Sequence, residues 1–380
     1  MRRYIANLDG LRFLAATTVA CSHLEDVKSY ATDYSFHNRF IKNAPQISVT
    51  FFFVLSGFLI MWWFLEDTKG NVQKIDVKKF YLYRISRTWP LYFLLVSISL
   101  VVSIINGSFS GNEALLKRFA LYFLFLPNSA DIFYGPDVFL GPTWSLAVEE
   151  FFYLLFPLVL VQIPRNKLFK RLVFICFGTL LFSIALNPIF ISVTIGDKVS
   201  LPGIVHYLNI IADRYRFYSF LLGAISSYLV FNEVRLPDVL KFIGIKQKIQ
   251  LFSLLLLLLF LCGITFSFAT QQIYSCLFAL FLYTITRVNY SSKFLNCNFL
   301  KTGGKISYGI YMLHMLVVFR LVNQLNFLIP VQNKFLNIFV SWSLMLGLTY
   351  VISYISFYYF ETAMRDKMRQ GITIPVKNEN

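Results

Sequence analysis

The chain has 380 residues, of which 57% are hydrophobic and 18% aromatic, and its formal net charge is +16. Only 14% of the residues are charged and the mean hydropathy is +0.62, which excludes an ordinary soluble globular protein. The positive charge does not indicate a nucleic-acid-binding protein, because the basic residues are spread over the connections between apolar segments. The five cysteines show no Cys-x-x-Cys spacing, so we expect neither a disulfide framework nor a metal site.

Apolar segments long enough to cross a bilayer recur along the whole chain. They predict an all-α fold, a polytopic membrane helix bundle with about ten transmembrane helices, at residues 8–28, 46–65, 80–105, 143–162, 170–190, 214–232, 250–268, 271–288, 306–325 and 336–360. The segment 117–126 is shorter and amphipathic, and we expect it at a membrane interface. We predict two regions, a membrane domain at 1–364 and a short polar cytoplasmic tail at 365–380.

The distribution of basic residues predicts the orientation of the bundle. If the N-terminus is cytoplasmic, most of the 35 Lys and Arg residues fall in cytoplasmic connections and few fall in outer loops. This asymmetry follows the positive-inside rule, so both termini are expected in the cytoplasm. The basic excess is then a consequence of topology, and no nucleic-acid partner is expected.

The first predicted span contains ionisable residues at bilayer depth, where they are costly and usually functional. Arg12 and His23 are eleven positions apart, which on a helix is three turns plus about 20°, so they share a face. Asp9 precedes Arg12 by three positions and is expected to pair with it. The alternative for His23 is a packing residue whose hydrogen bonds are satisfied inside the bundle.

Two arginines at the start of the third predicted span suggest an anion site. Arg84 and Arg87 are one helical turn apart, so their guanidinium groups can converge on one anion and bind phosphate oxygens bidentately. Arg12 is expected near the same cytoplasmic mouth. The alternative is an anchor for anionic lipid headgroups.

Adjacent carboxylates, Glu149 and Glu150, lie inside the fourth predicted span. A helix rises 1.5 Å per residue, which places His23 about 24 Å along the first span and Glu149 about 9 Å below the outer surface. We therefore expect His23 and Glu149 at a similar depth, with the arginines at the opposite mouth. The alternative for Glu149 is a salt bridge to an interior arginine.

Other polar motifs carry weaker signals. Ser56 and Gly57, followed by Phe58, form a small step where backbone can approach a ligand or another helix. Arg214 and Arg216 are expected at the outer end of the sixth span, where they either bind sugar or extend toward the headgroups. His314 falls in the middle of the ninth span.

These motifs, taken in order, resemble the acyltransferase-3 family of integral-membrane acyltransferases. The resemblance covers nearly the whole chain and rests on Leu8-Asp9-Gly10-Leu11-Arg12 with His23, Phe51 to Leu59, Arg84-Ile85-Ser86-Arg87, Trp144-Ser145-Leu146-Ala147-Val148-Glu149, Arg216 before Gly223, Ile306 to Tyr311 with His314, and Tyr359-Phe360-Glu361.

The resemblance implies an O-acyltransferase of the bacterial cytoplasmic (inner) membrane, with the membrane domain at 1–364 carrying the activity. The implied donor is acyl-CoA, most often acetyl-CoA, acting as a co-substrate with no tightly bound cofactor. The implied acceptor is a hydroxyl group of a cell-surface polysaccharide or lipid-linked sugar. The residues implied are His23 and Glu149 in catalysis, Arg12, Arg84 and Arg87 on the CoA phosphates, and Asp9, Ser56, Gly57, Phe58, Trp144, Ser145 and Arg216 in support or acceptor contact.

One alternative in mechanism and one in function stay open. His23 acts either as a general base, with Glu149 orienting the imidazole, or as the carrier of a transient acyl group. The alternative function is a proton-coupled secondary transporter of an anionic or sugar-like substrate, in which Asp9, His23 and Glu149 relay protons.

Overall fold

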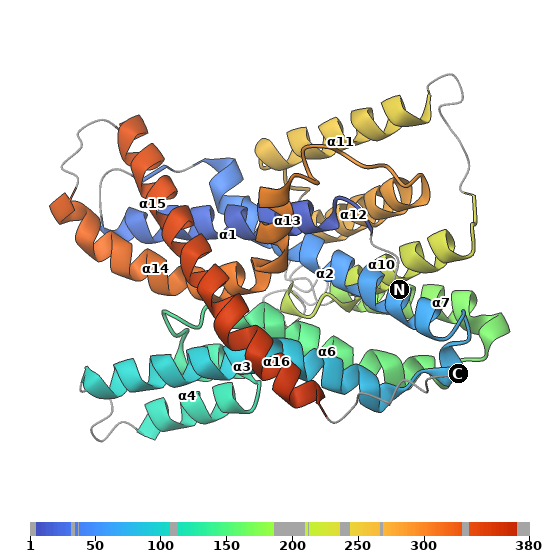
Figure 1. The fold of residues 1–380 in the computed structure, drawn as a ribbon, viewed down its shortest axis with the longest axis horizontal. Helices are drawn as coiled ribbons and strands as arrows, with labels where there is room; N and C mark the ends of the chain where they lie inside the picture. The colour runs from blue at the N-terminus through green and yellow to red at the C-terminus, as the bar shows by residue number, and fades with distance from the viewer. Residues whose placement is uncertain are drawn as a thin grey trace, which may run out of the picture.

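A computed structural model describes residues 5–31, 35–36, 38–106, 113–185, 210–211, 213–235, 244–266, 269–328 and 334–370. All regular elements in these ranges are helices, as predicted (Figure 1). They are α1 (Leu8–Ala31), α2 (Arg39–Asp67), α3 (Val77–Ile105), α4 (Glu113–Phe123), α5 (Pro127–Tyr134), α6 (Thr143–Leu160), α7 (Leu168–Ala185), α10 (Phe217–Phe231), α11 (Ile245–Leu261), α12 (Thr270–Arg287), α13 (Asn298–Lys305), α14 (Ser307–Leu328), α15 (Lys334–Ile355) and α16 (Thr362–Arg369).

Each of the ten predicted spans overlaps one helix, but fewer helices meet the requirements for crossing a membrane. In the described ranges five segments are long and apolar enough, namely Arg39–Asp67, Val77–Ile105, Thr143–Leu160, Arg165–Ala185 and Phe335–Arg369. The pair α13 and α14, bent by 75°, counts as a sixth if it forms one span. The helical membrane fold is thus confirmed, whereas ten spans and cytoplasmic termini stay predictions.

The helices that fall short do so for identifiable reasons. Helix α1 carries five charged side chains: Asp9, Arg12, Glu25, Asp26 and Lys28. Helices α10 and α11 have 15 and 17 residues, whereas an apolar helix needs about 20 to cross the hydrocarbon core.

Helix α2 is the centre of the bundle and packs against α1, α10 and α12. Glycines let the backbones of α2 and α10 approach closely. A Cβ atom added at Gly57 would overlap the carbonyl group of Phe220, and one added at Gly223 would overlap the carbonyl oxygen of Val54. Phe58 is fully buried and its ring is parallel to that of Trp62 at 6.1 Å. Gly57 and Phe58 therefore hold α2 in place.

The C-terminal helices return to the start of α3. Helix α15 continues through a π-helical turn, Ser356–Glu361, into α16, which packs against α3. Arg369 donates from Nε to Ser86 Oγ at 2.8 Å and from Nη2 to the Tyr83 carbonyl oxygen at 3.0 Å. The predicted boundary between residues 364 and 365 falls inside α16. The division into two regions stays a prediction.

Candidate functional site

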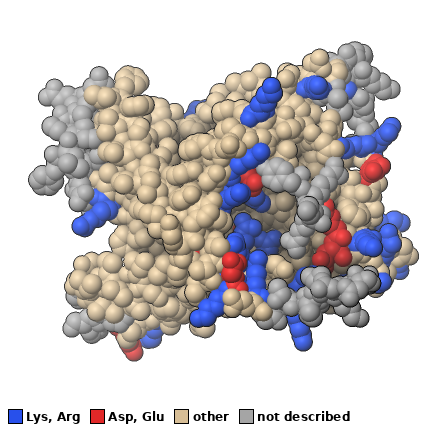
Figure 2. All heavy atoms as spheres, viewed as in Figure 1, with Lys and Arg blue, Asp and Glu red and all other residues tan. Residues whose placement is uncertain are grey.

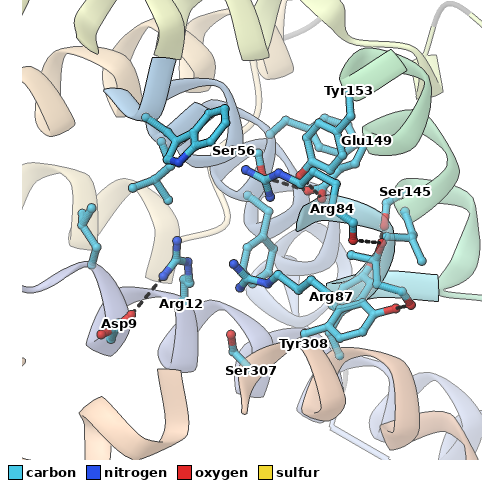
Figure 3. A pocket seen from close by; sticks show the side chains of 18 of the residues that line it. Asp9, Arg12, Ser56, Arg84, Arg87, Ser145, Glu149, Tyr153, Ser307 and Tyr308 are labelled. Atoms are coloured by element: carbon cyan, nitrogen blue, oxygen red, sulfur yellow. Dashed lines mark hydrogen bonds and ion pairs between the residues drawn. The ribbon is translucent and has the colours of Figure 1, made fainter. Parts of the chain in front are cut away.

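A cavity of about 480 Å³ lies among α1, α2, α3, α6 and α14. Its volume is in the range of small-molecule sites, which are usually apolar with a few placed polar groups. Here the charged lining is unusually rich for the interior of a membrane protein, with Asp9, Arg12, Glu66, Arg84, Arg87 and Glu149. Figure 3 shows most of these side chains pointing into the same space.

Three arginines from two helices converge on this cavity, as their spacing predicted (Figure 3). Arg12 Nη1 lies 2.9 Å from Asp9 Oδ1, so its charge is partly balanced. Arg84 lies with its Cζ 4.5 Å from the centre of the Tyr153 ring. Arg87 is exposed to the cavity and makes no hydrogen bond or ion pair with any described residue. An arginine without a partner among the described residues, beside two others, makes this a candidate anion site.

A second cavity, of about 390 Å³, adjoins the first and shares Arg12, Arg84 and Arg87 with it. Its other basic lining residues are Lys305 at the end of α13 and Arg365 and Arg369 on α16. Six cationic side chains thus face two carboxylates, Asp9 and Glu361, in the described lining.

From the sequence, Lys305, Arg365 and Arg369 are expected only in the basic cytoplasmic part of the chain, and not at a binding site. Nothing in their spacing separates them from the other basic residues of the positive-inside pattern. Figure 2 shows that Lys and Arg gather from the centre to the right-hand side of one face, whereas its left-hand side is mostly uncharged. Only the return of α16 to α3 brings Arg365 and Arg369 to the cavity.

Glu149 lines the same cavity as the arginines. Its Oε1 accepts a hydrogen bond from Ser56 Oγ at 3.1 Å and its Oε2 accepts one from Tyr153 Oη at 2.7 Å. The expected separation of Glu149 from the arginines is corrected, because Glu149 and all three arginines line one cavity. Arg84 lies against the ring of Tyr153, whose hydroxyl group donates to Glu149.

The neighbouring carboxylate is held separately. Glu150 accepts hydrogen bonds from Thr88 Oγ1 at 2.7 Å and from Trp89 Nε1 at 3.4 Å, both on α3. Tyr308 of α14 donates to the Thr88 carbonyl oxygen at 2.7 Å. Glu150 thus joins α6 to α3, and Glu149 is the carboxylate that faces the cavity.

His23 contacts another histidine and not Glu149. Its Nδ1 lies 2.8 Å from His314 Nε2, and the two ring planes are nearly parallel, 17° apart, with centroids 5.1 Å apart. The expectation that Glu149 orients the His23 imidazole is therefore corrected in favour of His314. The sequence could not reveal this pair, because the two residues are 291 positions apart on α1 and α14.

The histidine pair lies behind one wall of the first cavity. Tyr311 and Ser145 line that wall, and their hydroxyl oxygens are 2.7 Å apart. The Tyr311 ring is 6.1 Å from the ring of His314, one turn along α14. His23 is not among the described residues that line either cavity, and His314 connects it to the wall at Tyr311 and Ser145.

Some of the remaining predicted residues line the first cavity, and the others pack between helices. Ser56 and Ser145 line the first cavity, whereas Trp144 packs beneath Arg214, whose Cζ is 5.5 Å from its ring. Arg216 is only 1% exposed, and its guanidinium donates to the Thr50 hydroxyl at 3.0 Å and to side-chain and backbone oxygens of Gln46 and Asp213. It lies outside both cavities and ties the start of α10 to α2.

Comparison with known proteins identifies a family that matches most of the chain. The family described as "Acyltransferase domain", acyltransferase-3, matches residues 5–358. The chain is 27% identical to the O-acetyltransferase OatA of Staphylococcus aureus (strain NCTC 8325 / PS 47) over 96% of its own length and 58% of that protein. It is 26% identical to a putative O-acetyltransferase, SACOL0978, of Staphylococcus aureus (strain COL), over 97% of this chain and 58% of that protein.

A third relative matches over a shorter region. The peptidoglycan O-acetyltransferase OatA of Listeria monocytogenes is 33% identical over 45% of this chain and 27% of that protein. The chain thus spans less than two thirds of the length of these relatives, and no solved structure gives a significant match. Since the family match covers nearly the whole helical bundle, from residue 5 to residue 358, the chain belongs to the acyltransferase-3 family of membrane acyltransferases.

Proposed function

We propose that this chain is a membrane O-acyltransferase that transfers an acyl group, most often acetyl, from acyl-CoA to a hydroxyl group of a cell-surface glycan or lipid-linked sugar. The family membership and the names of the relatives, one of which is called a peptidoglycan O-acetyltransferase, support this activity. The observation that carries the proposal is the pair of adjoining cavities with six basic side chains inside an apolar bundle.

The cavities suit the donor because CoA carries several phosphate charges at one end and a thin uncharged arm at the other. We assign the phosphates to the second cavity, where Lys305, Arg365 and Arg369 add to the shared arginines. The arm then extends into the first cavity, whose walls away from the arginines are mostly apolar and aromatic, as at Phe52, Phe53 and Tyr311. The thioester is placed near the wall formed by Tyr311 and Ser145.

In this proposal His23 is the general base. It takes the proton of the acceptor hydroxyl as that oxygen attacks the thioester carbonyl carbon, the carbon–sulfur bond breaks, and the proton passes to the CoA thiolate. A transient acyl group on His23 is the alternative chemistry. Ser145 and Ser56, which line the cavity, are candidate donors to the developing oxyanion. Glu149 balances the charge of Arg84, beside which it lies.

The rival function is a proton-coupled transporter, which would use the same arginines to bind an anion. The two differ in their products, because a transporter moves its substrate unchanged whereas the enzyme releases free CoA. The family of the chain favours the enzyme. We propose the bacterial cytoplasmic membrane as its location, with acyl-CoA, a glycan acceptor and membrane lipids as its partners.

The test measures both products of the reaction. Purified protein in lipid vesicles receives acetyl-CoA and a soluble peptidoglycan fragment, and free thiol and the mass of the fragment are followed. We expect thiol release and an added acetyl group, and a loss of about 10²- to 10⁴-fold in the variant His23→Ala, which is typical of removing a general base. Wild-type turnover in a well-folded His23→Ala protein would contradict the assignment. Mass spectrometry of surface glycans from cells with and without the gene identifies the acceptor.

A further inference from the structure

The surroundings of His314 determine which histidine donates and which accepts the hydrogen bond between His23 and His314. His314 Nδ1 lies 3.3 Å from the carbonyl oxygen of Ile310, one turn earlier on α14. A carbonyl oxygen only accepts hydrogen bonds, so the proton of a neutral His314 belongs on Nδ1. His314 Nε2 is then unprotonated and faces His23 as an acceptor.

The same reasoning extends to His23. Its Nδ1 is 2.8 Å from His314 Nε2, a distance at which one of the two nitrogens must carry the proton. Since His314 Nε2 is the acceptor, His23 Nδ1 is the donor. A neutral His23 then has no proton on Nε2, and that nitrogen carries the lone pair that a general base needs. The helix backbone thus fixes the tautomer of both rings.

Burial separates the roles of the two histidines. His314 is completely buried, with 0% of its surface exposed, and lies next to both His23 and Tyr311. His23 retains an accessible part of its side chain. Only His23 can therefore meet a substrate, whereas His314 acts through it.

We propose, resting on the function proposed above, that His314 is the positioning residue of the reaction, which holds His23 with its proton on Nδ1 and its Nε2 free to act as the base. When the acceptor hydroxyl gives its proton to His23 Nε2, the imidazolium keeps its Nδ1–H···Nε2 hydrogen bond to His314. The positive charge is stabilised by that bond until the proton passes to the CoA thiolate. The acid in the serine-protease triad has the same task, which here falls to a neutral imidazole.

Two substitutions separate a hydrogen-bond role from a packing role. His314→Leu fills the space but cannot accept a hydrogen bond. His314→Gln supplies an amide oxygen to accept from His23 Nδ1 and an amide N–H to donate to the Ile310 carbonyl. We expect kcat to fall about 10- to 100-fold in His314→Leu, within the 10²- to 10⁴-fold contribution of a general base, with the KM for acetyl-CoA unchanged. His314→Gln should recover most of the kcat. Wild-type kcat in His314→Leu, or an equal loss in both variants, would overturn the proposal.

A measurement on the unmodified protein tests the tautomers directly. The chain has four histidines, so ¹⁵N labelling of histidine gives few ring signals, which the variants His23→Ala and His314→Gln assign. We expect both His23 and His314 to carry the proton on Nδ1. A proton on Nε2 of neutral His23 would overturn the proposal even if His23→Ala is inactive, whereas activity in His23→Ala would instead overturn the proposed function.

Discussion

We predict that Gly57 in α2 serves to let α2 and α10 pack closely, and the substitution Gly57→Ala tests this. The added Cβ would lie within 2.7 Å of three backbone atoms of Phe220 on α10, its O, C and Cα. No side chain can move aside to relieve that overlap, so the backbones of α2 and α10 must separate. Overpacking of a tight core typically costs about 1–3 kcal/mol, and this backbone overlap belongs at the upper end of that range.

An opposing effect reduces the net loss. Alanine is a better helix former than glycine by about 0.5–1 kcal/mol, so we expect Gly57→Ala to lower the free energy of unfolding by about 2 kcal/mol. Gly178→Ala in α7 is the matched control, because nothing lies within 4 Å of its added Cβ. That variant should be as stable as the wild type or slightly more stable.

Thermal unfolding in detergent, followed by far-ultraviolet circular dichroism, compares the two variants. An unchanged unfolding temperature in Gly57→Ala would refute the close packing of α2 on α10. If Gly57→Ala is as stable as Gly178→Ala but inactive, the backbone at Gly57 contacts the substrate, and our interpretation of the step as a packing feature is wrong.

Four further substitutions test the assignments around the cavities. Arg84→Lys and Arg87→Lys keep the charge but lose the bidentate geometry, so each should raise the KM for acetyl-CoA about tenfold, the effect of one lost charge-assisted hydrogen bond; a normal KM with an altered lipid dependence would favour a headgroup anchor. Arg216→Met should destabilise the protein by about 1–3 kcal/mol in thermal unfolding, because its hydrogen bonds to Thr50, Gln46 and Asp213 are lost. It should leave the KM for either substrate unchanged, because Arg216 lines neither cavity; a raised acceptor KM would favour a role in acceptor binding. Glu149→Gln keeps an acceptor oxygen but removes a negative charge beside Arg84, so the KM for acetyl-CoA should fall; a large loss of kcat at constant KM would instead make Glu149 catalytic.

The sequence predicted the elements of the fold because apolar periodicity is local. Each predicted span overlaps a helix, and the convergence of Arg84 and Arg87 followed from their spacing of three residues on α3. Contacts between distant helices could not be predicted in this way. His314 meets His23 only because α14 packs against α1, and Arg369 reaches Ser86 only because α16 returns to α3.

The error in depth arose from treating each span as if it began at the membrane surface. The rise per residue gives a distance along one helix and not where residues of two helices meet, and Arg84 and Glu149 line one cavity. Glu149 therefore meets the arginines instead of the imidazole. Burial also changed the interpretation of Arg216, since an arginine at a predicted helix end proved to be 1% exposed and fully engaged.

The most direct test of the account is the sidedness of the reaction. Protein reconstituted in vesicles in one orientation, established by protease access to a terminal tag, receives acetyl-CoA on one side and a soluble peptidoglycan fragment on the other. We predict transfer only when acetyl-CoA is on the side of the basic cavity formed with Lys305, Arg365 and Arg369, and the fragment is on the opposite side. Equal transfer with both substrates on the side of the basic cavity would contradict a reaction across the membrane.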